Sequence, residues 1–398
     1  MIVFDGVTKT YPDGTVAVDD LSLEAPSGKI TVLVGPSGCG KTTSLRMVNR
    51  MIKPTSGTIS LDGRDTSRMK EAELRRGIGY VIQHAGLFPH RTVLDNVSTV
   101  PRLLGVNRRD SEKRSMELLE RVGLDPAFAK RYPAQLSGGQ QQRVGVARAL
   151  AADPPVMLMD EPFSAVDPVV REQLQDEFLR LQGELGKTII FVTHDIDEAI
   201  KLGDQVAVLR VGGKLAQVAE PAYLLSHPVD DFIADFVGRD RGYRALSFQP
   251  TPRLPLAQER TVAMGEDVAR LDTDWVLVVD ERNHPLGWVE PRRVHGEVTS
   301  EVLHRGGTVA RASGPLRAAL DAALSSPSRR GVIVDDAGAL VGTVRAHEVL
   351  TAIEDTDRPE LEDPDHPGAA SPAASGTSAP TSAASASSAA GTVSDASA

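Results

Sequence analysis

Short apolar runs alternate with longer stretches of mixed character from residue 1 to about residue 240. The runs are rich in Val, Ile, Leu and Met and are bounded by polar residues, which is typical of strands buried on both faces of a sheet. We expect such strands at residues 30–34, 78–82, 156–160 and 188–192. Helix-forming composition between the strands predicts helices at residues 42–52, 111–122, 141–152 and 169–185. This alternation predicts an α/β fold with a parallel sheet.

Further strands are indicated at both ends of this region. We expect strands at residues 1–8, 16–23 and 57–61, and a hairpin whose arms are residues 206–211 and 215–218. Residues 223–225 and 232–237 look helical, and the polar segment 239–242 is expected to end the first domain. We therefore expect a second domain in the chain after residue 242.

The second part of the chain contains an internal repeat. Residues 278–294 align without gaps on residues 333–349, and an upstream strand recurs at 261–262 and 308–309. The residues that recur are Val279, Asp280, Gly287, Val289 and Val294 in one copy and Val334, Asp335, Gly342, Val344 and Val349 in the other. Each copy is expected to form a strand, a turn, a strand and a helix. A further helix at 316–324 is largely missing from the shorter first copy. Two unrelated hairpins are the alternative to a pseudo-symmetric pair.

Composition limits the class of protein. The chain has 398 residues, 41% hydrophobic and 25% charged, which is ordinary for a globular protein with two folded domains. Its net charge of −10 argues against a nucleic-acid binder held by phosphate contacts. Residues 356–398 are acidic at first and then rich in Ala, Ser, Pro and Thr, so we expect a disordered tail. No apolar run approaches the roughly 18 residues of a membrane helix, and no signal peptide is expected.

The first candidate site is a glycine-rich run between a predicted strand and a predicted helix. It consists of Gly35, Pro36, Ser37, Gly38, Cys39, Gly40, Lys41, Thr42 and Thr43. This run fits the phosphate-binding pattern G-x-x-x-x-G-K-[ST]. Free N–H groups at a helix N-terminus favour an anion, a lysine reaches the β- and γ-phosphates, and a Thr hydroxyl binds Mg²⁺. Cys39 is the only cysteine, so no internal disulfide is expected.

Polar residues at other strand ends extend this site. Asp160 and Glu161 end a buried apolar run, where a phosphate-loop protein holds Mg²⁺ and orients a water molecule. His194 follows the strand at 188–192 and can hydrogen-bond a phosphate or a polarised water. Gln83 follows another strand and is either a polar cap or a contact to metal or water. Tyr11 is either an ordinary residue at a strand end or a ring that stacks on a base.

A second turn of small residues precedes the predicted helix at 141–152. Its residues are Leu136, Ser137, Gly138, Gly139 and Gln140. Small residues before a helix form a potential anion site, although the turn alone is weak support.

Together these motifs resemble the ATP-binding subunit of an ABC transporter. The resemblance rests on the phosphate loop, the 136–140 turn, Asp160 and Glu161, the 164–167 loop, His194, Gln83 and Tyr11. It implies a P-loop ATPase with a RecA-like core, an antiparallel β subdomain and a helical subdomain. It makes Lys41, Glu161 and His194 catalytic, and assigns Mg²⁺ to Thr42, Gln83 and Asp160. The implied nucleotide contacts are Tyr11, residues 35–43, Gln83, Ser137, Gly138, Gly139, Gln140 and Asp167.

A narrower resemblance concerns importers of glycine betaine, proline betaine, carnitine and choline. It rests on residues 79–83, 87–93 and 235–242. Those subunits carry a C-terminal pair of CBS units, which the repeat resembles. We therefore expect an ABC domain at 1–238, a linker at 239–254 and a tandem CBS-like domain at 255–355.

The CBS-like units depart from the nucleotide-binding pattern. Glu290 and Arg293 follow the first glycine, and Arg345 and Glu348 follow the second, where many such units have Thr or Ser and Asp. No adenosine ligand is predicted here. The resemblance associates the pair with sensing ionic strength or a signalling nucleotide.

The family resemblance also implies partners. Two copies pack head to tail, so that the turn at Ser137 faces the γ-phosphate held by Lys41 of the other copy. Permease subunits in the membrane and, indirectly, an extracytoplasmic binding protein are expected, which places the chain peripherally on the cytoplasmic face. The alternatives are an importer ATPase for another small solute, a soluble ABC ATPase that acts on DNA or ribosomes, and a protein that is chiefly a regulatory sensor.

Overall fold

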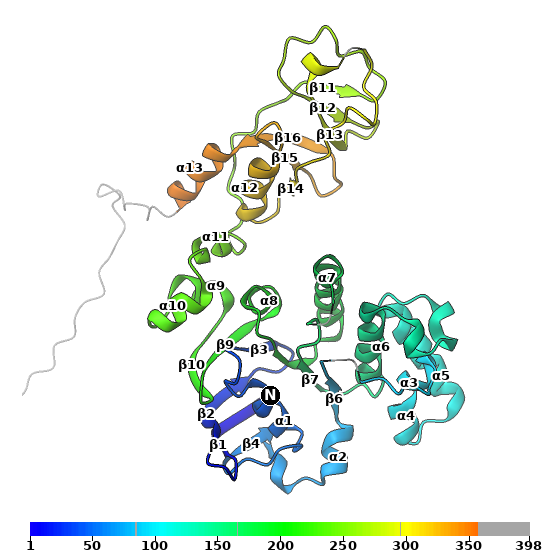
Figure 1. Ribbon diagram of the computed structural model, residues 1–398, viewed down its shortest axis with the longest axis vertical. Helices are drawn as coiled ribbons and strands as arrows, with labels where there is room; N and C mark the ends of the chain where they lie inside the picture. The colour runs from blue at the N-terminus through cyan, green and yellow to red at the C-terminus, as the bar shows by residue number, and fades with distance from the viewer. Residues whose placement is uncertain (84–85, 165, 295, 357–398) are drawn as a thin grey trace, which may run out of the picture.

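A computed structural model describes residues 1–83, 86–164, 166–294 and 296–356. Of the tail predicted at 356–398, residues 357–398 lie outside the described residues. The described part contains a larger region, residues 1–245, followed by two small sheet units (Figure 1).

A six-stranded sheet forms the centre of the larger region, with strand order β10-β9-β3-β8-β7-β6. Its strands are β3 (Ile30–Val34), β6 (Ile78–Val81), β7 (Val156–Asp160), β8 (Thr188–Val192), β9 (Gln205–Arg210) and β10 (Lys214–Ala219). All neighbours are parallel except β10, which pairs antiparallel with β9 at the edge. Every residue of β3, β7 and β8 is buried, which is why these strands read as continuous apolar runs. The predicted parallel α/β core is confirmed.

Helices cover this sheet and connect its strands. They are α1 (Lys41–Val48), α2 (Glu71–Arg76), α6 (Gly138–Leu150), α7 (Pro168–Leu185) and α8 (Ile196–Leu202). Among these helices, two predicted boundaries differ from the structure by three residues or more. α1 ends before residue 52 because Arg50 adopts a left-handed φ of 54°. α6 starts before residue 141 because Ser137 caps it, as described below.

An antiparallel sheet with strand order β2-β1-β4-β5 packs beside the core. Its strands are β1 (Ile2–Thr10), β2 (Val16–Ala25), β4 (Ser56–Leu61) and β5 (Arg64–Asp65). Apolar side chains of this sheet share one buried cluster with β3, β7 and β8, so the two sheets form one domain core.

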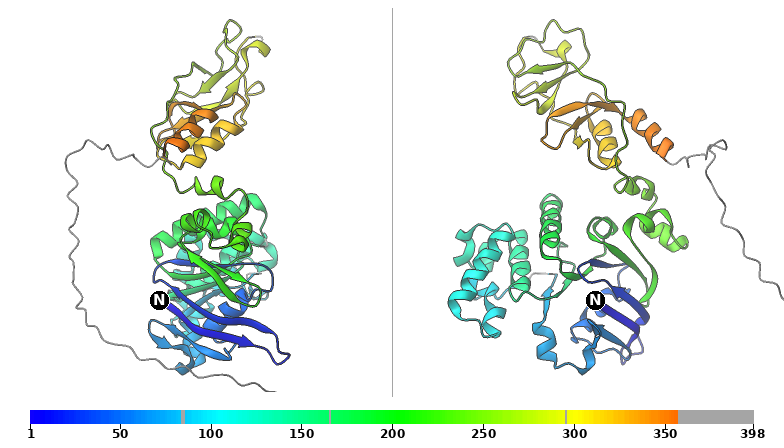
Figure 2. Two further views of the ribbon diagram at one scale, coloured as in Figure 1. Left: turned by 90° about the vertical axis from the view of Figure 1, so that its left-hand side faces the viewer. Right: turned by 180° about the vertical axis from the view of Figure 1, so that it is seen from behind.

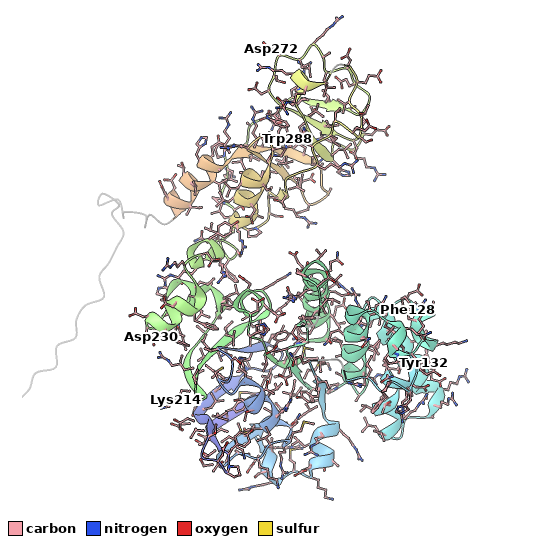
Figure 3. All side chains as sticks on the ribbon, viewed as in Figure 1. Phe128, Tyr132, Lys214, Asp230, Asp272 and Trp288 are labelled. Atoms are coloured by element: carbon pink, nitrogen blue, oxygen red, sulfur yellow. The ribbon has the colours of Figure 1, made fainter. Side chains whose placement is uncertain are left out.

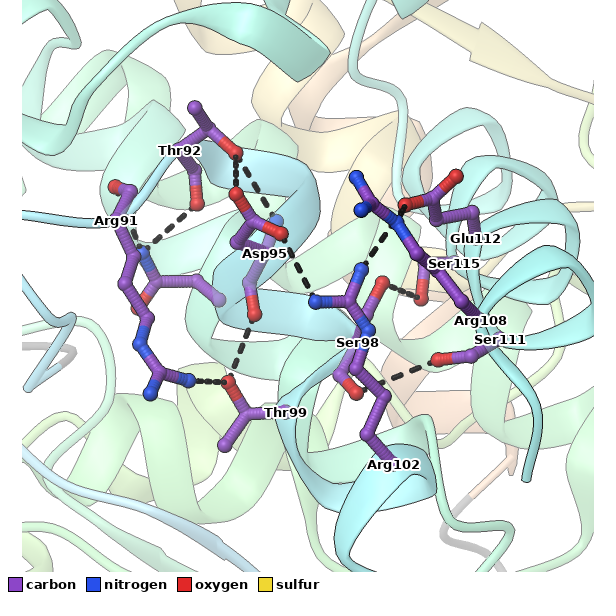
Figure 4. A network of polar contacts seen from close by, with 11 residues as sticks. Arg91, Thr92, Asp95, Ser98, Thr99, Arg102, Arg108, Ser111, Glu112 and Ser115 are labelled. Atoms are coloured by element: carbon purple, nitrogen blue, oxygen red, sulfur yellow. Dashed lines mark hydrogen bonds and ion pairs between the residues drawn. The ribbon is translucent and has the colours of Figure 1, made fainter. Parts of the chain in front are cut away.

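A helical part projects between β6 and β7 in the chain. It contains α3 (Val93–Val97), α4 (Thr99–Leu103) and α5 (Arg108–Arg121), with short 3-10 helices at Pro126–Lys130 and Pro133–Gln135. Arg102 links these helices, because its guanidinium donates to Asp95 at 3.1 Å and to Glu112 at 3.0 Å (Figure 4). A buried hydrogen bond of 2.9 Å joins the hydroxyls of Ser98 and Ser115. These contacts tie α3 and α4 to α5.

Three helices follow the edge hairpin: α9 (Pro221–Ser226), α10 (Asp231–Val237) and α11 (Arg241–Ala245). The segment 239–242, interpreted from sequence as a polar break, instead leads into α11. Gly238 makes the turn between α10 and α11 with a φ of 87°. Within the segment 239–254 that we expected to be a linker, residues 241–245 thus form a helix.

The two repeat copies form sheets of the same topology. The first unit consists of β11 (Thr261–Ala263), β12 (Val276–Val279) and β13 (Pro285–Val289). The second unit consists of β14 (Val309–Arg311), α12 (Leu316–Ser325), β15 (Arg330–Val334), β16 (Leu340–Arg345) and α13 (Ala346–Thr356). In each unit the middle strand pairs parallel with the first strand and antiparallel with the third. This shared pairing explains the sequence repeat.

The first unit lacks the second helix that the repeat predicted. After β13 the chain forms only the 3-10 turn Pro291–Arg293, and Gly296 then takes a φ of 123°, which a helix cannot include. Trp288 of this unit is 2% exposed and packs with Leu277 against Val332 and Val334 of the second unit (Figure 3). The second unit lies between the first unit and α11 in all views (Figures 1 and 2).

Candidate nucleotide-binding site

The glycine-rich run forms the connection between β3 and α1, as predicted. Two of its glycines are required by their surroundings. A Cβ on Gly35 would lie 2.3 Å from the carbonyl oxygen of Leu209, and one on Gly40 would lie 2.1 Å from that of Ala17. Both residues also have positive φ, which disfavours any side chain. The loop is therefore packed tightly against β2 and β9 and holds its shape at the N-terminus of α1.

A cavity of about 670 Å³ opens onto this loop. Residues from several distant segments line it: Ala17, residues 35–43, Glu161, His194 and Phe236. Its base consists of backbone N–H groups at a helix N-terminus, where an anion is stabilised. The size and polarity of the cavity suit a nucleotide.

Lys41 lies across the loop rather than pointing into solvent. Its Nζ donates to the carbonyl oxygens of Gly35 at 2.7 Å and Pro36 at 3.0 Å, and the residue is 7% exposed. The Sγ atom of Cys39 is 3.7 Å from the same amine. Burial raises the pKa of the Cys39 thiol above its usual value, although the nearby Lys41 amine opposes this. The lysine charge is thus held directly beside the space that a phosphate would take.

Thr42 and Asp160, two of the three predicted metal ligands, meet across the site. The Thr42 hydroxyl donates to Asp160 Oδ1 at 2.8 Å, and Asp160 is 5% exposed. Arg46 on α1 approaches the other oxygen, with 3.6 Å from its Nη2 to Asp160 Oδ2. A hydroxyl and a buried carboxylate are hard oxygen donors of the kind that Mg²⁺ prefers.

The carboxylate of Glu161 contacts two further predicted site residues, Gln83 and His194. Its Oε2 accepts from Gln83 Nε2 at 3.4 Å and lies 3.0 Å from His194 Nδ1. Glu161 also has a φ of 46°, in the left-handed region that a non-glycine residue seldom adopts. The Ser164 hydroxyl holds this turn by donating to the Glu161 carbonyl at 2.9 Å. Strain of this kind, supported by neighbours, is typical of functional positions.

Other predicted residues lie outside the cavity. Ser137 caps α6: its Oγ accepts from Gln140 N at 3.3 Å, while Gln140 Oε1 accepts from Ser137 N at 3.0 Å. Ser137 and Gly138 are exposed, and the second turn does not contribute to the cavity wall in this chain. Gly139 is buried against Val170 of α7.

Asp167 and Tyr11 are likewise absent from the described cavity lining. Asp167 caps α7 by accepting from Val170 N at 3.1 Å. Tyr11 lies at the β1–β2 turn with the Lys9 amine 5.2 Å from its ring centroid. The structure therefore gives Asp167 a local structural role. That Asp167 and Tyr11 contact a nucleotide stays a prediction.

Sequence reasoning missed two lining residues, Ala17 on β2 and Phe236. Phe236 lies on α10 and stacks with Phe232, with 6.0 Å between the ring centroids. Its spacing from Phe232 identifies a shared helix face but not the cavity that this face borders. Only the tertiary structure brings α10 beside the phosphate loop.

A family model described as ABC transporter matches residues 18–164. The osmoprotectant import ATP-binding protein OsmV of Salmonella typhimurium is 43% identical over 364 residues, which cover 86% of this chain and 94% of the relative. The choline transport ATP-binding protein OpuBA of Bacillus subtilis is 39% identical over 376 residues, covering 89% and 97%. The glycine betaine uptake system ATP-binding protein YehX of Escherichia coli is 47% identical over 270 residues, covering 68% and 86%.

Solved structures show the same relationship for the larger region. The dimeric structure of MJ0796, a bacterial ABC transporter cassette, matches with a TM-score of 0.51 at 36% identity, covering 56% of this chain and 99% of that chain. CbiO1 from Clostridium perfringens, part of the ABC transporter complex cbiONQ, matches with a TM-score of 0.55 at 27% identity, covering 62% and 94%. Within residues 1–356, apart from the gaps given above, no helix is both long and apolar enough to cross a membrane.

Proposed function

This chain belongs to the ATP-binding subunits of ABC transporters, in the osmoprotectant importer family, and on that premise we propose that the cavity at Gly35–Thr43 binds MgATP. Its activity is ATP hydrolysis coupled to transport. The observation that carries the site assignment is the meeting of Gln83, Glu161 and His194 beside the phosphate loop.

Glu161 is the proposed general base. Its carboxylate borders the cavity, and its strained backbone aims it from the end of β7. His194 and Gln83 hold that carboxylate from two sides and can orient the attacking water. Lys41 leaves its loop carbonyls to contact the β- and γ-phosphates and stabilises the charge that develops there.

Thr42 and Asp160 are the proposed holders of Mg²⁺, with Gln83 as a third contact. When bound, the ion neutralises phosphate charge. Thr42 contributes its hydroxyl, and Asp160 contributes a buried carboxylate that is already aligned with that hydroxyl at 2.8 Å. Arg46 would balance the second Asp160 oxygen.

The ATP-binding subunits of ABC importers work as dimers with membrane permease subunits. We propose that the exposed Ser137–Gln140 turn completes the site of a second copy packed head to tail. The capping box leaves the N–H groups of Gly138 and Gly139 at a helix N-terminus, where they suit a γ-phosphate. Asp167 and Tyr11 are further proposed contacts of the nucleotide, Tyr11 by stacking on the adenine.

The proposed cargo is a quaternary-amine osmoprotectant of the glycine betaine, carnitine or choline type. Support comes from relatives whose names state such transport and which match across nearly their whole length. A binding protein outside the membrane and a peripheral location on its cytoplasmic face follow from this assignment. Another small solute is the alternative cargo. The soluble alternative, an ATPase acting on DNA or ribosomes, has no support from these transport proteins.

The repeat pair is the proposed regulatory domain of tandem CBS type at 255–355. The Arg293 guanidinium pairs with Glu290 at 2.8 Å, and the Glu348 carboxylate accepts from the backbone N–H of Arg345 at 2.6 Å. These contacts do not supply the free hydroxyl expected of a nucleotide site. Ionic strength is therefore favoured as the signal, because salt screens charge pairs over about 8–10 Å.

Uptake by the reconstituted transporter tests this function. The chain, its permease and the binding protein are placed in liposomes containing ATP, and radiolabelled glycine betaine, carnitine, choline and proline betaine are supplied at several salt concentrations. We expect ATP-dependent uptake of at least one betaine and no uptake with the Glu161→Gln chain. Uptake of unrelated solutes alone would refute the proposed cargo.

A further inference from the structure

The helix that follows His194 is held from outside the nucleotide cavity. α8 begins two residues after His194, and Asp195 caps it by accepting from Asp197 N at 2.9 Å and from Glu198 N at 3.4 Å. This cap makes the histidine loop and the first turn of α8 one local unit. A contact that fixes this first turn therefore also restricts His194.

Arg244 of α11 makes such a contact. Its Nη2 donates to Asp197 Oδ2 at 3.2 Å, and its Nε lies 2.8 Å from Asp197 Oδ1 and 3.3 Å from Asp240 Oδ2, so the guanidinium pairs with both carboxylates. The same guanidinium donates through Nη1 to the carbonyl of Val237 at 2.5 Å. The Arg244 side chain is only 12% exposed, whereas that of Asp197 is 62% exposed, so the pair is shielded from solvent on its arginine side alone.

The other side of α11 belongs to the second repeat unit. Leu246, directly after the helix, is 7% exposed and packs in one cluster with Leu316 and Leu320 of α12. The backbone continues this attachment, because Arg317 N donates to the carbonyl of Leu246 at 3.2 Å. The Arg317 guanidinium also lies over the ring of Tyr243, 4.7 Å from its centroid. A displacement of the second unit would therefore move α11.

The space beside this pair is polar rather than packed. A cavity of about 660 Å³ is bounded by residues of α7 and α8 on one side and of α12 on the other. Its charged lining includes Glu172, Asp195, Lys201 and Asp321. A cavity of this size and charge favours water over close apolar contact. The Arg244–Asp197 pair thus provides a direct polar contact between α8 and α11, the helix that carries the second unit.

We propose that Arg244 is a positioning residue for His194, through which the second repeat unit sets the rate of ATP hydrolysis. The proposal rests on the function assigned above to His194. Neither Arg244 nor Asp197 borders the nucleotide cavity, so breaking the pair loosens the histidine without removing a nucleotide contact. The expected signature is a lower kcat with an unchanged KM for ATP.

The test uses the full chain assembled with its permease. Asp197→Asn removes one charge at an exposed position, and Arg244→Ala removes the other; each is expected to lower kcat roughly threefold to tenfold, a range typical of coupling through a packed network. The double variant should lose no more than Arg244→Ala alone, because Asp197→Asn weakens only a contact that Arg244→Ala already removes. Asp197→Glu, which keeps the charge, should recover most of the rate.

Arg241→Ala is the matched control, because it removes an arginine from the same short helix and leaves the pair intact. Unchanged kcat in both Asp197→Asn and Arg244→Ala would overturn the proposal. So would a parallel rise in KM, or a loss of thermal stability in Asp197→Asn that accounts for the lost rate. Only this inference fails if wild type hydrolyses ATP, His194→Ala does not, and the Arg244 and Asp197 variants hydrolyse ATP at the wild-type rate. The proposed function itself is contradicted if wild type shows no ATP hydrolysis in complexes that take up solute.

Discussion

The nucleotide site gathers polar side chains from the ends of parallel strands, whereas the repeat pair gathers apolar side chains from the faces of its strands. Asp160 and Glu161 end β7, and His194 follows β8, so the topology alone brings their carboxylates and ring to one edge of the sheet. In the repeat pair, Trp288 and Val332 meet across two sheets and make no polar site. Substitutions should therefore change turnover in the first region and stability in the second.

The largest expected effect concerns the general base. Glu161→Gln keeps the size of the side chain and removes its ability to accept a proton, so we expect turnover to fall by about 10²- to 10⁴-fold. ATP-dependent dimers should persist, because the substitution removes no phosphate contact. Steady-state hydrolysis and size-exclusion chromatography with MgATP measure both. Glu184→Gln, at an exposed position of α7, is the control; normal hydrolysis by Glu161→Gln would disprove the assignment.

The repeat pair should respond through stability. Trp288→Ala leaves a large void between the two units, and we expect a loss of about 3–5 kcal/mol in the unfolding free energy of this region. Hydrogen exchange or limited proteolysis of residues 255–356 would report it. Leu286→Ala on the same strand is 37% exposed and should cost much less. Equal effects of the two substitutions would show that the packing between the units contributes little.

Lys41→Ala should weaken nucleotide binding. A charged hydrogen bond of this kind contributes about 1.5–3 kcal/mol, which predicts roughly 10- to 100-fold weaker affinity for ATP. Isothermal calorimetry on the full chain measures it. Lys29→Ala removes a lysine that pairs with Asp204 at the surface and serves as control. Unchanged ATP affinity in Lys41→Ala would contradict the phosphate-loop assignment.

The smallest expected effect is a pH-dependent change in stability at Glu198. Burial raises the pKa of this carboxyl, while hydrogen bonds from Thr193 and Gln175 oppose the shift. The folded pKa therefore exceeds the unfolded one, so the stabilisation by protonation is complete below the unfolded pKa and is lost as pH rises through the folded pKa. Glu198→Gln should raise the melting temperature at pH 8 and match wild type in acid.

Each unit of the pKa shift at Glu198 corresponds to about 1.4 kcal/mol, or a few degrees in melting temperature for a domain of this size. Calorimetric scans across pH would reveal the effect. Glu172→Gln on neighbouring α7 is the exposed control. A lower melting temperature for Glu198→Gln at pH 8 would mean that the hydrogen bond from Gln175 needs a charged acceptor.

Local patterns predicted the ATPase core well because their physical cause is local. A continuous apolar run such as 156–159 is stable as a strand that is covered on both faces of its sheet. A glycine-rich run before a helix favours an anion, because free N–H groups lie at the helix N-terminus. Boundaries were less accurate, since caps and left-handed residues such as Arg50 decide them. The missing helix after β13 shows the same limit, because the repeat resembles a helical copy, whereas the chain is already extended at Val294 after a single 3-10 turn.

The sequence by itself determined the chemistry available to this protein, the order of its strands and helices, and its family, since these depend on residue types and their spacing. Only the tertiary structure decided which of those residues meet. It joined Thr42 to Asp160, brought Phe236 to the phosphate loop and linked Arg244 to Asp197. Such contacts join segments far apart in the chain, and their geometry comes from the packing of whole elements rather than from any local pattern.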